Sequence, residues 1–576
     1  MKIIGITFSF LLSIGIYHQS REYNIDNQSV KTILTSNINS LITAVKNFKT
    51  EKSKPNFKTM RSAFFVLSWS YFPLDLIEEQ RSVNDMKFKV LDSSECYESY
   101  GSLQMIEHEL LQKEPNEEKI QLALAALEGF IRQLEDKISQ HEWSIPEVLA
   151  ALMIQQQDIY ASLLTASYHL DTEEVINDYD KILNQHLILL KHLNEAKHYS
   201  KYYKRLSNYF RRKTFNDISY IDCYERNILP LHQKFLKELQ KNYPAYQINM
   251  STIRTTLDEK GLFNKDWISP THFHGKDFDL GNEKRIQLGK LLFYDPILSI
   301  NNKRTCASCH QPQKAFTDGR TTSIALDYPD RLKTNSPTLI NSIYNIEYGH
   351  DRSKKTLQEQ IDFVIHSNQE FGSTYKEIIS KLNASKAYRQ YFKLAFPKRN
   401  KIDSTQISKA ITSYVATLNS FESDFDHLMQ GNKQVKDSEK VLKGFDLFMG
   451  KAQCGICHQP PLFSGLNTVA GSQQYYICKE DVKTKVPTLR NIDYTIPYMY
   501  DGRISSKKAL FDYLFKQHVW YEDNYEDKLN ADEKELLITF FESLNDTTAL
   551  QFSATVQLPN VEDTSKNIDR RPGGLY

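Results

Sequence analysis

The stretch Thr305-Cys306-Ala307-Ser308-Cys309-His310 decides the fold of this chain, and Cys454-Gly455-Ile456-Cys457-His458 repeats its pattern in the C-terminal part. Both contain Cys-x-x-Cys-His, the attachment signature of c-type haem. Two thiols one helical turn apart can add to the two vinyl groups of a porphyrin, and the adjacent imidazole then lies under the iron. A zinc knuckle would need further ligands nearby, and a thioredoxin-like redox pair does not require the histidine. The sequence therefore predicts two covalently bound haem c groups, held by Cys306, Cys309 and His310 and by Cys454, Cys457 and His458.

The composition of the chain excludes few functions but agrees with this interpretation. Lys+Arg 72 against Asp+Glu 71 leaves a net charge of +1, so no basic face indicates nucleic acid as a partner. Four of the 7 cysteines lie in the haem motifs. Of the remaining three, Cys96 and Cys223 could form a disulfide in an exported protein.

The N-terminus has the pattern of a secretory signal. Lys2 precedes an apolar run from Ile3 to Tyr17, after which the sequence becomes polar. We expect a signal peptide over residues 1–20 and a periplasmic location, because c-type haem is attached on the oxidising side of the membrane. The run is short for a membrane span, so we expect membrane association only if the signal stays uncleaved.

The spacing of apolar residues predicts a mainly α protein. Apolar residues recur three and four positions apart from Ile120 to Ile138 and again from Val148 to Leu164. This periodicity is typical of a helical bundle, and we find no catalytic constellation in it. The two haem motifs are far apart, so each is expected to centre its own cytochrome c-like domain. The predicted parts are a helical N-terminal domain over 21–265, a first haem domain over 280–425, a second over 426–550 and a surface tail over 551–576.

The region from about residue 285 to 548 resembles the bacterial dihaem cytochrome c peroxidases and the related MauG-type enzymes. Besides the two haem motifs, six strings carry this resemblance in order and spacing. They are Gly289–Ser299, Ala315–Gly319, Asn335–Leu339, Leu357–Gln360, Pro487–Asn491 and Pro497–Gly502.

A weaker resemblance lies in the N-terminal domain. Gly101–Glu107 is similar to the Gly-x-His-x-x-Glu string of imelysin-like helical domains. Gln104 stands where that string has histidine, which favours a packed helix over a metal site.

The resemblance implies a role for each haem. The first haem is the peroxidatic one, with His310 as its proximal ligand, and the second, held by His458, receives electrons. Gln360 and Glu370 correspond to the distal pair of the family. Cleavage of a peroxide O–O bond needs a base that takes a proton from one oxygen and returns it to the other. A carboxylate such as Glu370 can serve, although without the resemblance a solvated loop acid would be the simpler interpretation.

Two positions depart from the family pattern. Leu326 stands where the peroxidases place a histidine that caps the resting iron, and no histidine occurs between His310 and Asn335. Leucine cannot coordinate iron, so we expect an open first haem, as in the MauG-like branch. His350 stands where the relatives have a tryptophan between the haems. His350 and His366 are the histidines further along the chain that could reach the iron instead.

The sixth ligand of the second haem is expected on the helix after Asp501-Gly502. Phe511, Leu514 and Phe515 share a helical face with His518, at spacings i, i+3, i+4 and i+7. We predict His518 as the ligand, with Met499 and Tyr513 as rivals.

The resemblance also implies a calcium ion between the two haem domains. The corresponding ligands are the side chain of Asn335 and carbonyl groups of Thr495 and Pro497. Oxygen ligands suit this hard ion, although Asn335 could simply cap a turn before Pro337.

These observations predict an enzyme that reduces hydrogen peroxide to water. Electrons would come from a small redox protein, a cytochrome c or a cupredoxin, and pass through the second haem to the first. One alternative is a MauG-like oxidase acting on an organic or protein substrate. Another is an electron-transfer cytochrome without turnover, which would have no need for Glu370 and Gln360.

Overall fold

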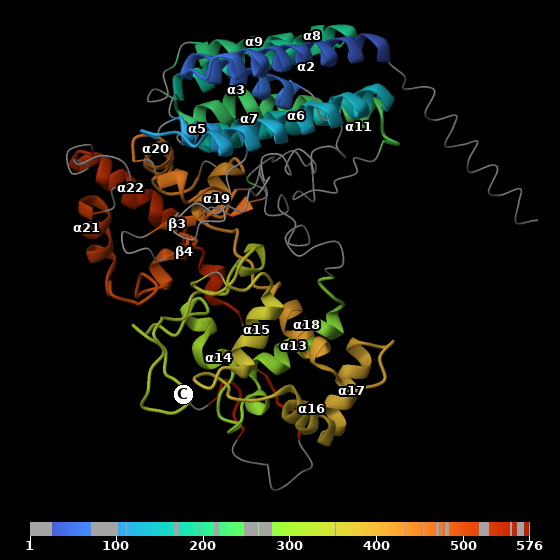
Figure 1. Ribbon diagram of the computed structural model, residues 1–576. Coiled ribbons are helices and arrows are strands. Elements are labelled where there is room, and N and C mark those ends of the chain that lie inside the picture. The colour runs from blue at the N-terminus through green and yellow to red at the C-terminus, as the bar shows by residue number, and fades with distance from the viewer. Residues whose placement is uncertain are drawn as a thin grey trace, which may run out of the picture. The chain divides into compact units, whose positions relative to one another are not determined.

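The structure is a computed structural model that describes residues 26–70, 102–110, 112–165, 172–193, 195–211, 213, 218–246, 263, 279–351, 353–432, 434–452, 454–467, 472–473, 475–477, 483–517, 529–552, 556–560 and 570–574. The signal segment, Cys96 and His518 lie outside these residues. The chain forms two compact units, one of Met1–Trp267 with Thr468–Ser472 and one of Ile268–Asn467 with Gln473–Tyr576. Most described residues are helical, which confirms the predicted mainly α fold (Figure 1).

The first unit is a bundle of long helices lying side by side (Figure 1). Amphipathic spacing forms it: α6 buries Ile120, Leu124, Leu127 and Ile131 on one face, while Asn116 caps its first turn. Helix α7 is buried on almost all sides and packs against α11. The elements are α2 (Asn27–Thr50), α3 (Lys54–Ser70), α5 (Ser102–Glu109), α6 (Glu117–Gln140), α7 (Ile145–Thr165), α8 (Thr172–His192), α9 (Ala196–Arg211), α10 (Tyr220–Cys223), the π-helix η3 (Tyr224–Ile228) and α11 (Leu229–Asn242).

The second unit carries both haem motifs on short helices among longer ones. In its first half the helices are α13 (Glu283–Tyr294), η5 (Pro296–Leu298), α14 (Cys306–Cys309), η6 (Pro312–Lys314), η7 (Ser342–Tyr344), α15 (Leu357–His366), α16 (Tyr375–Ala384), α17 (Lys386–Ala395) and α18 (Ser404–Val415). In its second half they are α19 (Asp424–Met429), α20 (Ser438–Met449), η8 (Cys454–Ile456), η9 (Ile492–Tyr494), α21 (Lys507–Gln517), α22 (Ala531–Ser543) and η10 (Thr547–Leu550). The strands are β1 (Leu466–Asn467), β2 (Ser472–Gln473), β3 (Tyr475–Ile477) and β4 (Lys483–Lys485), with Tyr475 opposite Lys485 in the antiparallel β3–β4 pair.

Each half of the second unit is built on one close helix crossing. Helix α13 crosses α18 at Gly289, where an added Cβ would lie 1.8 Å from the carbonyl oxygen of Ala410. Helix α20 crosses α22 at Gly444, where an added Cβ would lie 2.2 Å from the carbonyl oxygen of Leu536. The backbones approach this closely only because glycine has no Cβ. The two halves are therefore repeats of one scaffold.

The described part of the C-terminal segment lies on the surface and is held to the second unit by specific contacts. Arg570 forms an ion pair with the fully buried Asp295 at the end of α13. Gly573 accepts a hydrogen bond from the Ser308 hydroxyl of the first haem motif (3.3 Å) and donates one to the Tyr294 carbonyl (2.9 Å). The polar composition of residues 551–576 concealed these contacts, because the partners of Arg570 and Gly573 lie more than 250 positions earlier in the chain.

The crossing at Gly444 gives a test of the repeated scaffold. Gly444→Ala should destabilise the second unit by about 1–3 kcal/mol, because the new methyl group overlaps the Leu536 carbonyl. Helix propensity alone would make the same change stabilising by about 1 kcal/mol. Urea unfolding followed by haem absorbance measures the difference. Gly129→Ala in α6 is the matched control, because nothing lies within 4 Å of its added Cβ, and it should not destabilise. An unchanged midpoint for Gly444→Ala would contradict the close crossing.

Candidate functional site

The first haem motif forms a single capped helical turn. Thr305 precedes α14, and its hydroxyl accepts a hydrogen bond from the Ser308 amide (3.1 Å). The Ser308 hydroxyl in turn accepts one from the Thr305 amide (3.1 Å). This capping box holds Cys306 and Cys309 in one turn, three residues apart, so both thiols lie on the same side of it.

The thiols have the properties of attachment sites rather than of a redox pair. Burial raises the pKa of Cys306 to about 12 and that of Cys309 to about 11, and it raises the pKa of Cys454 to about 12. A reactive redox pair instead needs a lowered thiol pKa. Within the described parts of the chain, the one group of three metal-ligand side chains belongs to the first unit, whereas both motifs belong to the second. The structure therefore supports neither a zinc knuckle nor a thioredoxin-like redox pair at these motifs.

Each motif histidine is oriented by hydrogen bonds to one ring nitrogen. The Nδ1 atom of His310 lies 3.0 Å from the carbonyl oxygen of Phe316 and 3.1 Å from the hydroxyl of Ser336. The Ser336 hydroxyl donates its own proton to the Cys309 carbonyl (2.8 Å), so Nδ1–H donates to Phe316. Burial also lowers the pKa of His310. The imidazole is thus neutral with a free Nε2 lone pair, the form that binds iron.

The second motif repeats this arrangement. The Nδ1 atom of His458 lies 3.0 Å from the Pro487 carbonyl oxygen and 3.3 Å from that of Phe463. With Cys454 and Cys457 beside it, this donor set fits a second haem c. The residues present in both motifs therefore suit the group that the sequence predicts.

Glu370 lies in the turn after α15, close to the first motif. Its charge raises the pKa of both Cys306 and Cys309, so the carboxyl group is near the two thiols. Burial raises the pKa of Glu370 itself to about 7, against the opposing charges of Arg304 and Lys354. A carboxyl group with this pKa exchanges its proton near neutral pH.

Gln360 lies on α15, ten residues before Glu370. Its Oε1 atom is buried and has no hydrogen-bond partner. A Cβ added at Gly349 would lie 3.6 Å from this atom, so the amide is directed toward the turn that contains His350. A buried amide oxygen without a partner is costly unless a bound molecule satisfies it.

The loop around Leu326 lies against the Glu370 turn. The Leu326 amide donates to the Gln369 carbonyl (2.7 Å), and the buried Leu326 side chain lies 3.0 Å from the Cβ that Gly372 would carry. Leu326 is thus adjacent to the predicted distal residues, and no ligating side chain replaces it there.

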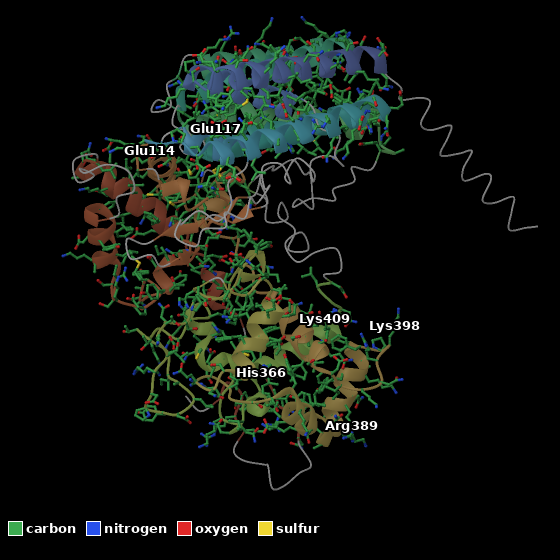
Figure 2. All side chains as sticks on the ribbon, in the orientation of Figure 1. Glu114, Glu117, His366, Arg389, Lys398 and Lys409 are labelled. Atoms are coloured by element: carbon green, nitrogen blue, oxygen red, sulfur yellow. The ribbon has the colours of Figure 1, made fainter. Side chains whose placement is uncertain are left out.

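His350 and His366, the two histidines that could have reached the iron, each contact other groups. The His350 ring stacks on Tyr500, with 5.9 Å between ring centroids and an angle of 9°. His366 is exposed at the end of α15, and its Nδ1 lies 2.7 Å from the Asp362 carbonyl oxygen (Figure 2).

Of the predicted calcium ligands, the structure brings two together. The Asn335 side-chain amide donates to the Pro497 carbonyl (2.9 Å), and the Asn335 backbone amide donates to the Tyr500 carbonyl (2.9 Å). Rotating the side-chain amide by half a turn would place its oxygen beside that carbonyl. Thr495 bonds through its hydroxyl to Ile492 (3.3 Å). The sixth ligand of the second haem stays a prediction, because His518 lies outside the described residues.

Sequence reasoning missed the side chains that set the charge of the site. Arg304 is 2% exposed and precedes the capping residue Thr305, and Lys354 follows the turn of His350. It also missed Arg490, which forms a bidentate ion pair with Asp426 at 2.7 and 2.8 Å, with both side chains buried. One indication of Arg304 was present in the sequence, because a cationic residue there lies next to a haem motif.

Comparison with known proteins gives consistent matches over this region. Residues 283–434 match the family described as di-haem cytochrome c peroxidase. Cytochrome c551 peroxidase of Nitrosomonas europaea is 30% identical over 302 residues, which cover 50% of this chain and 87% of that protein. The methylamine utilization protein MauG of Methylorubrum extorquens is 28% identical over 255 residues, 42% of this chain and 71% of that protein. A solved structure, of a MauG-like protein associated with microbial copper homeostasis, is 27% identical with a TM-score of 0.42 and covers 47% of this chain and 91% of that one. No helix in the described ranges is long and apolar enough to span a membrane.

The donor sets of the two motifs predict two thioether-bound haems. The pyridine haemochrome of the denatured protein should report two c-type haems per chain. Cys454→Ser combined with Cys457→Ser should leave one haem, which acid butanone does not extract. Extraction of all haem from the wild type by acid butanone would contradict covalent attachment.

Proposed function

The chain belongs to the di-haem cytochrome c peroxidase family, and on that premise we propose that it reduces hydrogen peroxide to water in the periplasm. The reaction consumes one peroxide, two electrons and two protons and yields two waters. The electrons come from a small donor, a cytochrome c or a cupredoxin. The observation that carries the proposal is the partly buried carboxyl group of Glu370 near the first haem motif, with its pKa raised to about 7.

The first motif is the place of peroxide cleavage. A haem held by Cys306, Cys309 and His310 would supply the iron that binds the peroxide and the electrons that reduce it. The chain's own contribution on this side is the hydrogen bond from His310 Nδ1 to the Phe316 carbonyl (3.0 Å). This bond fixes the ring orientation and increases the basicity of Nε2.

Glu370 is the residue that moves the proton in this proposal. As a carboxylate it takes a proton from the peroxide oxygen nearer the motif, and as an acid it gives that proton to the departing oxygen, which leaves as water. A group that must both accept and donate works best with a pKa near the working pH. Burial has raised the pKa of Glu370 to about 7, which suits both steps.

Gln360 positions the peroxide. Its buried Oε1 has no partner in the described structure, so it can accept a hydrogen bond from a peroxide O–H. An amide does not titrate near neutral pH, so Gln360 orients the substrate while Glu370 transfers the proton.

The second motif is the proposed entry point for electrons. The turn of His350 and the turn of Tyr500 meet through their stacked rings, and the Lys485 amide donates to the His350 carbonyl (3.4 Å). These contacts hold the two haem-bearing halves in one packed unit, which short-range electron transfer between haems requires. Calcium held by Asn335 and Pro497 would add a further link at the same boundary.

A MauG-like oxidase is the second candidate, and Leu326 favours it. Leu326 lies against the Glu370 turn and cannot coordinate iron. A haem held by His310 would therefore need no prior reduction to release a histidine ligand. An organic or protein substrate could then supply the electrons in place of a redox protein. Consumption of peroxide in the steady state with a generic reduced cytochrome separates the two activities. The same assay excludes a plain electron carrier if turnover occurs.

Glu370→Gln should keep both haems and the fold but slow peroxide turnover by about 100-fold, the usual scale for a proton-transfer group. In the wild type, turnover should rise with pH through about 7, because only the ionised carboxyl group accepts the proton. This ionisation should be missing from the residual activity of Glu370→Gln. Stopped-flow mixing with peroxide over about two pH units on either side of that pKa measures both effects.

Glu359→Gln is the matched control for this variant. Glu359 is an exposed acid on the same helix as Gln360, bound to the Lys355 amide (2.7 Å). Glu359→Gln should leave the rate of peroxide turnover and its pH profile unchanged. Unchanged turnover in Glu370→Gln would remove Glu370 from the mechanism.

Leu326→His tests whether the first iron is ready without reduction. The oxidised wild type should contain one high-spin haem that binds cyanide or peroxide at once. In the variant, the new imidazole should reach the iron and give a low-spin resting form that reacts only after one-electron reduction. Electron paramagnetic resonance of the oxidised proteins reports both spin states. Two low-spin haems in the oxidised wild type would contradict the open site.

A further inference from the structure

Three metal-ligand side chains converge in the N-terminal unit, far in the sequence from the haem motifs. Glu195 immediately precedes α9, His198 lies in its first turn, and Glu238 lies on α11, which packs against α9. One ligand atom from each residue lies within 4.8 Å of the others. The His198 Nδ1 atom is 2.9 Å from Glu195 Oε2. The first two residues form a Glu-x-x-His pair, a spacing that directs both side chains to one metal in helical carboxylate proteins.

A buried hydroxyl group lies beside these three side chains. Tyr199 is 0% exposed, and its hydroxyl has no hydrogen-bond partner among the residues that the structure describes. Its ring stacks on Phe235 of α11, with centroids 4.3 Å apart. Burial and then the charges of Glu238 and Glu195 raise the pKa of the Tyr199 phenol, so Tyr199 lies close enough to both carboxylates to be affected by their charge. A buried hydroxyl without a partner beside two carboxylates needs a further atom to bond to.

Ion pairs among these residues do not account for the whole arrangement. Lys234 Nζ lies 2.9 Å from Glu238 Oε2, one helical turn away, and Asn242 also donates to Glu238. The Lys234 ammonium therefore neutralises one carboxylate. The same ammonium lies over the Tyr199 ring, 5.6 Å from its centroid, but the Tyr199 hydroxyl keeps no hydrogen-bond partner among the described residues. The ion pair gives no reason for Glu195 and His198 to face Glu238. A lone ion pair of this kind contributes about 1 kcal/mol or less, so a multivalent cation can displace it.

We propose that Glu195, His198 and Glu238 bind one first-row transition-metal ion, with the Tyr199 hydroxyl as a fourth ligand. Two carboxylates, an imidazole and a phenol form a donor set for zinc, manganese or iron rather than for calcium, which prefers oxygen ligands alone. The ion links the start of α9 to α11. This site is independent of the haem motifs, and the N-terminal unit gains a metal-binding function of its own.

Zinc is the probe, because it is redox-silent and is distinguished from haem iron by mass. The full-length haem protein is treated with a chelator, which leaves the covalent haems in place, and is then dialysed against excess Ca²⁺ to fill oxygen-only sites. Titration calorimetry with Zn²⁺ should show one site per chain, and elemental analysis after gel filtration should show one zinc beside two irons. Competition with Ca²⁺ should not reduce zinc binding.

Four variants connect this binding to the named residues. His198→Ala and Glu238→Gln should each weaken zinc binding by about 10-fold or more, the scale on which a lost metal contact is felt. Tyr199→Phe keeps the ring stacked on Phe235 and should also weaken binding. His192→Ala is the control, because His192 is an exposed histidine on the neighbouring helix α8 and should leave binding unchanged.

Stability gives a second measurement that does not depend on calorimetry. Zinc should raise the unfolding temperature of the wild type and of His192→Ala but not that of His198→Ala. Far-ultraviolet circular dichroism of each variant shows whether its bundle is folded. Absence of stoichiometric zinc, or zinc binding that is the same in His198→Ala and Glu238→Gln as in the wild type, would overturn the proposal.

Discussion

The hydrogen bond between a motif histidine and a backbone carbonyl group is the constraint on which both haem sites depend. In each half one such carbonyl group belongs to a phenylalanine in the left-handed region, Phe316 with φ 58° and Phe463 with φ 50°. In the second half the Pro487 carbonyl oxygen is a further acceptor, 3.0 Å from His458 Nδ1. The left-handed conformation of the two phenylalanines costs an L-residue about 1–2 kcal/mol, so it persists only where the surroundings require it. The chain turns back on itself at these residues, and bridges between Gln311 and Thr317 and between Gln459 and Ser464 close the two turns. The backbone therefore fixes the orientation of each motif histidine through its Nδ1 atom.

The two halves keep this turn and differ in what supports it. In the first half, Thr338 donates to the Ala315 carbonyl (2.6 Å), and Thr488 donates to the Leu462 carbonyl (2.7 Å) at the same place in the second. Two positions further on, the first half has the buried Ile340 and the second has Arg490. The Arg490 guanidinium lies between the rings of Phe421 and Phe463 and pairs with Asp426.

The buried Arg490–Asp426 pair makes the second half sensitive to change. Removing one partner of a buried pair leaves an uncompensated charge and costs about 3–5 kcal/mol, whereas an apolar pair of similar volume is often neutral. Phe463 contacts Arg490 with its ring and His458 with its carbonyl group, so the ion pair also restrains the ligand of the second iron. The first half has no such link through Ile340, and its histidine is restrained by Ser336 instead. The two halves thus restrain their motif histidines by different means.

The sequence predicted the parts of the fold that depend on near neighbours. Cys306, Cys309 and His310 lie within five residues, and the helices of the first unit follow a period that apolar residues display directly. The partners of Arg570 and Arg490 could not be predicted, because Asp295 and Asp426 lie 275 and 64 residues away. Glu370 was found only through family resemblance, since burial decides whether an acid is catalytic or solvated, and burial depends on the tertiary structure. The cluster of Glu195, His198 and Glu238 was missed for the same reason: α11 joins α9 only in the folded bundle.

Glu370 shows how a functional site reduces stability and how the chain limits that effect. Its pKa is about 7 in the folded protein against 4.5 for an exposed carboxyl group. Between these values the folded state holds more protons than the unfolded state, so this group's contribution to stability falls as pH rises from 4.5 toward 7. Burial alone would raise the pKa further, and the charges of Arg304 and Lys354 oppose it. The 2% exposure of Arg304 makes its charge effective at this distance, because little solvent screens it. Desolvation and two cations together therefore hold the pKa of Glu370 near 7, where the carboxyl group can both accept and donate a proton.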